Sequence, residues 1–219
     1  MPRILFTKTG EAIWMSHLDL MRLFQRAFKR AGLPLTHTQG FNPRPSVSIA
    51  LPLSVGVESV CELLDFDLTG ERVSCQEITQ RLNRVLVPGI QVLETYDNGR
   101  KIKDLAYLAC AVTLEYDHGV PSDAVSALER LFARDALPVE KKSKNGVKEQ
   151  DLIPMMRQTA IEQVDDHTIE IRVTVTCQNP SMNPMQMVTA VERYLPEYMP
   201  DFAKSQRMEV YDINMKEFR

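Results

Sequence analysis

The segment SHLDLMRLFQRAFKRAGLP, residues 16–34, predicts a helix with one apolar and one basic face. Ser16 is a favourable N-cap, and Asp19 lies in the first turn, where the helix dipole favours a carboxylate. Gly32 followed by Pro34 ends the helix. The apolar residues recur at helical spacing and are Leu20, Leu23, Phe24, Ala27, Phe28 and Ala31. This helix is the reference point from which the neighbouring elements are placed.

Short β-prone segments lie on both sides of this helix. A second helix, with Ile78 and Leu82 in its apolar stripe, precedes the last of them and stops at Pro88-Gly89. The expected strands are residues 4–7, 35–38, 47–51, 60–68 and 90–93. Strand, helix, two or three strands, helix and strand is the order of a ferredoxin-like βαββαβ module.

The same order recurs after the turn cluster at residues 97–100. Residues 168–175 alternate most clearly between polar and apolar side chains and predict a central strand. The other expected elements are strands at 106–114 and 208–213 and helices at 125–132 and from Asn183-Pro184 onward. We therefore expect an α+β fold of two tandem ferredoxin-like modules with antiparallel sheets, covering residues 1–98 and 99–219.

Composition indicates a globular protein of the cytoplasm. Of the 219 residues, 44% are hydrophobic and 25% charged, and no apolar stretch approaches the roughly 20 residues of a membrane helix. No signal peptide is visible at the N-terminus. The cysteines lack metal-ligand spacing, so we expect reduced thiols, no metal and no cofactor. They are Cys61, Cys75, Cys110 and Cys177.

Basic charge is concentrated in residues 1–50, which hold seven Lys or Arg against two acidic residues, although the whole chain has a net charge of −3. Arg22, Arg26, Lys29 and Arg30 are three or four residues apart and form a continuous cationic helix face. Such a face can neutralise phosphates. The alternative is the solvated outer face of an amphipathic helix.

The loop GFNPRP, residues 40–45, is stiffened by its two prolines. It can present Phe41 and Arg44 for stacking on single-stranded RNA with little ordering cost. Alternatively, it is a rigid hairpin whose Phe41 packs inward.

A second basic segment surrounds Asn145-Gly146 and contains Lys141, Lys142, Lys144 and Lys148. It could form a cationic hairpin over a ligand groove. A solvated turn, diluted by neighbouring acidic residues, is the alternative.

Catalytic motifs are absent from the sequence: there is no GxSxG, P-loop, HExxH or GxGxxG pattern. His17 and His37 could support metal-free RNA cleavage by general acid–base chemistry if the fold brought them together. A binding role is therefore expected more strongly than a catalytic one.

Residues 16–59, SHLDLMRLFQRAFKRAGLPLTHTQGFNPRPSVSIALPLSVGVES, resemble the N-terminal signature of the bacterial radical-SAM-linked family, and KNGVKEQDL, residues 144–152, resembles its second characteristic segment. The resemblance implies a radical SAM partner protein. It also implies a link to RNA or ribosome biology, because family members tend to be encoded near ribonuclease G and ribosomal protein genes. This chain lacks the CxxxCxxC of a radical SAM cluster, and the family supplies no catalytic residues to transfer.

Three hypotheses follow. The first is a non-catalytic accessory of a radical SAM enzyme that binds or presents RNA related to tRNA or rRNA. The second is a metal-independent endoribonuclease, since the tandem order is similar to that of CRISPR repeat-processing endoribonucleases. The third is an adaptor that contacts only protein.

Overall fold

The computed structural model describes residues 1–143 and 146–219 (of residues 142 and 143, the backbone only) and has a mixed α+β fold. The chain divides into two compact units. Unit 1 comprises Met1–Asp104 together with Arg219, and unit 2 comprises Leu105–Phe218. The boundary therefore follows Asp104, a little beyond the turn cluster at residues 97–100.

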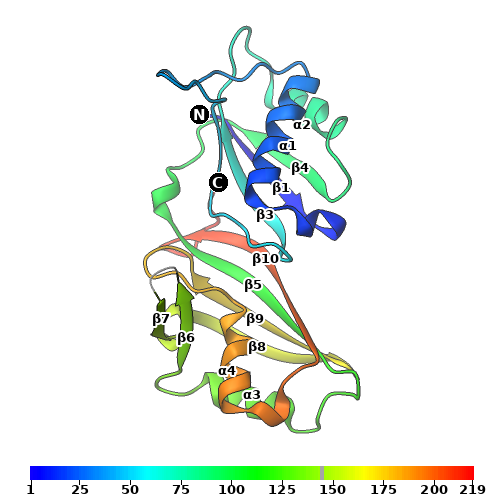
Figure 1. The fold of residues 1–219 in the computed structure, drawn as a ribbon, viewed down its shortest axis with the longest axis vertical. Helices are drawn as coiled ribbons and strands as arrows, with labels where there is room; N and C mark the ends of the chain where they lie inside the picture. Colours follow the sequence, from blue (N-terminus) through cyan, green and yellow to red (C-terminus); the bar gives the residue numbers. More distant parts are fainter. Residues whose placement is uncertain (144–145) are drawn as a thin grey trace. The chain divides into compact units, whose positions relative to one another are not determined.

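Unit 1 is an antiparallel sheet covered by two helices. Its elements are β1 (Arg3–Lys8), α1 (His17–Arg30), β2 (Val47–Ile49), β3 (Glu58–Phe66), α2 (Cys75–Asn83) and β4 (Ile90–Tyr96). The strand order is β4-β1-β3-β2, and each neighbouring pair is antiparallel. Both helices lie on the same face of this sheet, because their apolar residues share one core with the strands (Figure 1).

Aromatic side chains lie at the centre of this core. Phe24 of α1 meets Phe6 of β1 edge to face, with ring centroids 4.8 Å apart. Phe28, one turn later, packs against Phe66 of β3 at 5.0 Å. The apolar face predicted from the sequence thus fixes α1 against the sheet and leaves its basic face outward.

Unit 2 repeats the order of elements with an added hairpin. Its elements are β5 (Leu105–Glu115), α3 (Ala124–Phe132), β6 (Pro138–Ser143), β7 (Gly146–Asp151), β8 (Met156–Asp165), β9 (Thr168–Thr176), α4 (Gln186–Tyr194) and β10 (Phe202–Asp212). The sheet order is β10-β5-β9-β8, again antiparallel throughout, and β6 and β7 form a separate two-stranded antiparallel sheet. Short 3₁₀ helices occur at Gly10–Trp14 and Ile102–Asp104 in unit 1, and at Ile153–Met155 and Pro196–Tyr198 in unit 2. Without the hairpin, both units follow the spatial order fourth, first, third and second strand.

The structure differs from the sequence expectation in several elements, and the strand expected at 208–213 begins earlier, as β10 at Phe202. Residues 35–38 are not a strand but make isolated bridges, Leu35 to Leu68 and His37 to Pro45. Strand β8 was not expected, because nearly all of its side chains are exposed and no apolar alternation marks it. The helix at residues 125–132 and the strand at 168–175 are confirmed as α3 and β9.

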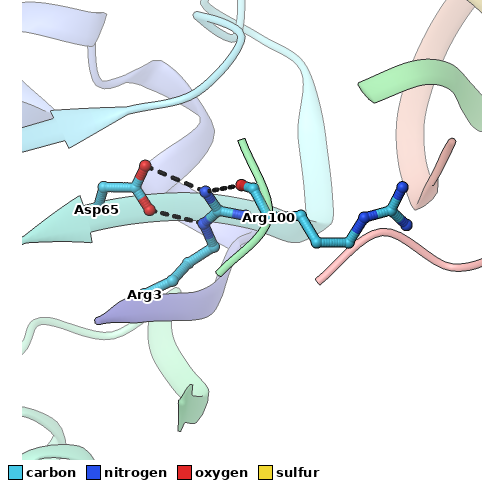
Figure 2. Close-up of polar contacts among 3 residues, drawn as sticks. All are labelled: Arg3, Asp65 and Arg100. Carbon is cyan, nitrogen blue, oxygen red and sulfur yellow. Dashed lines mark hydrogen bonds and ion pairs between the residues drawn. The ribbon is translucent and has the colours of Figure 1, made fainter. Parts of the chain in front are cut away.

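A buried arginine, Arg3, ties the start of unit 1 to β3 and to the segment that follows β4. The Arg3 guanidinium donates to both carboxylate oxygens of Asp65, at 2.6 and 3.1 Å, and to the Arg100 carbonyl oxygen at 2.7 Å (Figure 2). No helix within the described ranges is long and apolar enough to cross a membrane.

Candidate nucleic-acid interface

The basic face of α1 is set by a well-capped N-terminus. The Ser16 hydroxyl accepts from the Asp19 backbone N–H at 3.2 Å and donates to the Asp19 carboxylate at 2.7 Å. The hydroxyl and the adjacent Arg22 lower the pKa of Asp19, so this carboxyl is ionised at neutral pH. The cap fixes the start of the helix and therefore the direction in which its basic residues point.

Four basic residues were predicted to share one face of α1, and three of them line one groove, which we call the arginine groove. Arg22, Arg26 and Arg30 follow i, i+4 spacing and lie along its wall. The groove has a volume of about 630 Å³. Its remaining lining residues are Glu11, Trp14, Met15, Asp19, Leu23 and Val87.

The three arginines differ in their protein contacts. Arg22 forms an ion pair with Asp19 at 3.2 Å, and Arg30 donates to the Val85 carbonyl oxygen. Arg26 has no hydrogen bond or ion pair to any described residue, and its side chain is exposed. Arg26 is consequently the cation in the groove that an anionic ligand can bind without breaking a protein contact.

Trp14, which the sequence reasoning missed, lies in the same groove and is 65% exposed. Its ring packs over Gly56, where an added Cβ would lie 3.5 Å from the indole, and the Gly56 N–H donates to the Ile13 carbonyl oxygen at 2.9 Å. Gly56 has φ +81°, a conformation that favours glycine. The ring is thus supported on one side and open on the other. Its only sequence signal was that it is the single tryptophan of the chain.

Lys29 lies apart from the three arginines. It lines a second cavity of about 450 Å³ at the C-terminal end of α1, which we call the proline pocket. The other residues of this pocket are Gln25, Gly32, Leu33, Pro34, Leu35, His37 and Pro45. The basic face of α1 therefore borders two cavities rather than one surface.

The GFNPRP loop projects Phe41 into solvent. The loop is closed at its base, where the Thr38 N–H donates to the Arg44 carbonyl oxygen at 2.8 Å and the Arg44 N–H donates to the Thr38 hydroxyl at 3.0 Å. Phe41 is fully exposed, and the exposed Arg44 side chain has no polar contact with a described residue. Both side chains are available to a ligand, and the inward-packed alternative for Phe41 does not hold.

The lysine-rich segment forms the β6–β7 hairpin of unit 2. Lys141 pairs across the strands with Lys148, and its ammonium group donates to the Ser181 carbonyl oxygen at 2.9 Å. Glu149 pairs with Arg193 at 3.0 Å. Lys148 is exposed, whereas Lys144 and the side chain of Lys142 lie outside the described residues. Lys141 of the predicted cationic hairpin is therefore engaged in a hydrogen bond within the protein.

The structure does not bring the two candidate catalytic histidines together. His17 is the first residue of α1, and His37 lines the proline pocket at the other end of the helix. A helix of 14 residues spans about 21 Å. Among the described residues, no group of three or more His, Cys, Asp or Glu side chains could hold a metal ion.

Comparison with solved structures gives distant likenesses. The chain is similar to the archaeal box H/ACA sRNP Nop10–Cbf5 complex at 11% identity and a TM-score of 0.47, covering 94% of this chain and 46% of that chain. A structure of an H/ACA RNP bound to a substrate RNA containing 2'-deoxyuridine gives 8% identity, a TM-score of 0.47 and coverage of 99% and 49%. An unknown protein from Galdieria sulphuraria gives 15% identity, a TM-score of 0.26 and coverage of 94% and 96%. The chain spans about half the length of the first two structures.

Family membership is shown by the sequence. A comparison with curated proteins finds no match. Residues 2–184 match the family described as "Uncharacterized protein conserved in bacteria (DUF2344)". Because this match covers most of the chain, the protein belongs to that bacterial family.

Proposed function

We propose that unit 1 binds single-stranded RNA and that the chain acts as a non-catalytic accessory of a radical SAM enzyme. The observation that carries the RNA proposal is the arginine groove, where Arg26, which has no polar contact with a described residue, and the exposed Trp14 line one cavity. Guanidinium groups bind phosphate oxygens, and an open indole face stacks on a base. A cationic groove with an aromatic platform is a common means of binding single strands.

We further propose that the two units are ferredoxin-like modules. Two features support this assignment: each unit has the element order βαββαβ once the β6–β7 hairpin is set aside, and each has the strand order fourth, first, third, second. Such a module leaves α1 on the outer surface, where its polar face is open to a ligand.

The radical SAM partner is proposed from the resemblance of residues 16–59 and 144–152 to radical-SAM-linked proteins. In this proposal the partner supplies the chemistry and this chain holds the RNA. The placement of His17 and His37 at opposite ends of α1 favours this division of roles over metal-independent RNA cleavage, which needs an acid and a base near one phosphate.

The test is a fluorescence anisotropy titration of a labelled single-stranded RNA with the full chain. Arg26→Glu should weaken binding about tenfold or more, because a charge-assisted phosphate contact is lost and a repulsive charge added. The matched control is Arg84→Glu, the same charge reversal at the exposed C-cap of α2, outside both cavities. It should bind almost as the wild type does.

Three outcomes would contradict the proposal. Equal loss of affinity in both variants would indicate a general charge effect rather than a groove. Absence of RNA binding, combined with retention of a radical SAM protein in a pull-down, would favour the adaptor. Discrete cleavage products formed in EDTA and lost in His17→Ala or His37→Ala would instead indicate a nuclease.

A further inference from the structure

The proline pocket differs in chemistry from the arginine groove. Leu33, Pro34, Leu35 and Pro45 give it apolar walls, and only Gln25, Lys29 and His37 bring polar side-chain groups to it. At about 450 Å³ it is in the size range of small-molecule sites. Apolar walls with a few polar groups suit a flat heterocycle better than a phosphate.

The backbone around the pocket is held in place before any ligand binds. Gly32, with φ +67°, ends α1, and the Leu33 N–H donates back to the Phe28 carbonyl oxygen at 2.9 Å. The Thr69 N–H donates to the Pro34 carbonyl oxygen at 2.9 Å, and His37 bridges to Pro45. A ligand therefore meets a rigid wall, which lowers the ordering cost of binding.

The polar side chains of the pocket are open to a ligand. Gln25, Lys29 and His37 make no side-chain hydrogen bond or ion pair with any described residue. Gln25 and Lys29 are i and i+4 on α1, so their polar ends reach the same region of the pocket. An ammonium group donates only, whereas the amide of Gln25 can also accept.

We propose that the proline pocket binds one unstacked keto nucleobase, uracil or guanine, of the RNA strand. Lys29 would donate to the base carbonyl oxygen, and the Gln25 amide oxygen would accept from the neighbouring ring N–H. Held in the same orientation, cytosine and adenine would place an amino group, a donor, against the ammonium of Lys29, and an unprotonated ring nitrogen, an acceptor, against the Gln25 amide oxygen. The exposed Phe41 lies on the loop whose base contains Pro45, so it offers a stacking surface to a second base.

This inference rests on the proposed function, and the experiment separates the two. Fluorescence anisotropy is used to compare the affinity of the full chain for labelled oligouridylate and oligocytidylate of equal length. These strands have the same backbone and charge and differ in the donor and acceptor pattern of the base edge. We expect oligouridylate to bind about tenfold more tightly.

The variants test whether the preference arises in the pocket. Lys29→Met should bring the ratio of the two affinities close to one, and Gln25→Ala should reduce it. Arg26→Glu should weaken both strands by the same factor and leave the ratio unchanged. A charge that acts only on phosphates cannot change this ratio, so the ratio separates base recognition from general attraction.

Three results would be decisive against the proposals. A wild-type ratio near one, or a ratio that Lys29→Met leaves unchanged, would overturn the keto-base pocket while leaving RNA binding intact. Failure of both strands to bind at all would overturn the proposed function and the pocket assignment with it.

Discussion

Arg3 is a charged residue at a buried position, where most proteins have an apolar side chain. Its side chain is only 2% exposed, and the guanidinium is bonded to Asp65 and to the Arg100 carbonyl oxygen (Figure 2). Gly99 passes so close to Arg3 that an added Cβ would lie 2.9 Å from the guanidinium carbon. A buried charge of this kind depends on its ion-pair partner, because removal of the partner takes away an attraction that offsets the cost of burying the charge.

Substitution of Asp65 should therefore cost much more than loss of a surface ion pair. Asp65→Asn should lower the free energy of unfolding by about 3 kcal/mol. Asp97→Asn, which breaks the exposed pair with Arg72, should cost less than about 1 kcal/mol. Urea titrations of both variants check this, and equal effects would contradict the role given to the buried pair.

The cysteines should differ in their reaction with an alkylating reagent. Burial raises the pKa of Cys177 to about 12, and the residue is only 8% exposed, whereas Cys75 is partly exposed. Because the thiolate is the reactive form, mass spectrometry at mildly alkaline pH should find Cys75 modified well before Cys177. In denaturant the two should react alike. Equal rates in the native protein would show that Cys177 is not buried.

The same raised pKa makes a stability prediction with a defined sign. The folded protein holds the Cys177 proton more tightly than the unfolded chain, whose thiol titrates near the ordinary value of 9.0. The contribution of this thiol is therefore complete below that pH and is lost as the pH rises toward about 12. Cys177→Ala should reduce the loss of stability over this alkaline range, as measured by thermal unfolding at each pH.

At the scale of the element, α1 is both the best-predicted part of the chain and the one that carries the proposed site. Its cap, its apolar stripe and its C-terminal glycine are local signals, so the expected helix agrees with the structure. Strand β8 had no such signals, because an exposed edge strand shows no alternation. Residues 35–38 were expected to form a strand but make isolated bridges, which depend on distant partners.

The packing of α1 should dominate the stability of unit 1. Phe24→Ala removes a fully buried ring that contacts Phe6 and should lower the free energy of unfolding by about 3–5 kcal/mol. Leu18→Ala, on the exposed side of the same helix, should change it by less than about 0.5 kcal/mol. Denaturant titration separates the two, and a small effect at Phe24 would contradict the packing described.

At the scale of the whole molecule, the sequence shows which residues are basic but does not predict which of them line the same cavity. Helical spacing placed Arg22, Arg26, Lys29 and Arg30 on one face, yet the structure assigns the arginines to one cavity and Lys29 to another. The indole of Trp14 is supported by Gly56, which lies far from it in sequence. Such groupings arise from tertiary packing and leave no local pattern in the chain.

The central claim, that Arg26 in the arginine groove binds RNA phosphates, is tested most directly by the salt dependence of RNA affinity. For single strands, the logarithm of the affinity falls against the logarithm of salt concentration with a slope of about −0.7 per phosphate contact. Arg26→Glu should make this slope shallower by about 0.7 or more, whereas Arg84→Glu should keep the wild-type slope. An affinity that is independent of salt, or a slope that Arg26→Glu leaves unchanged, would contradict the claim.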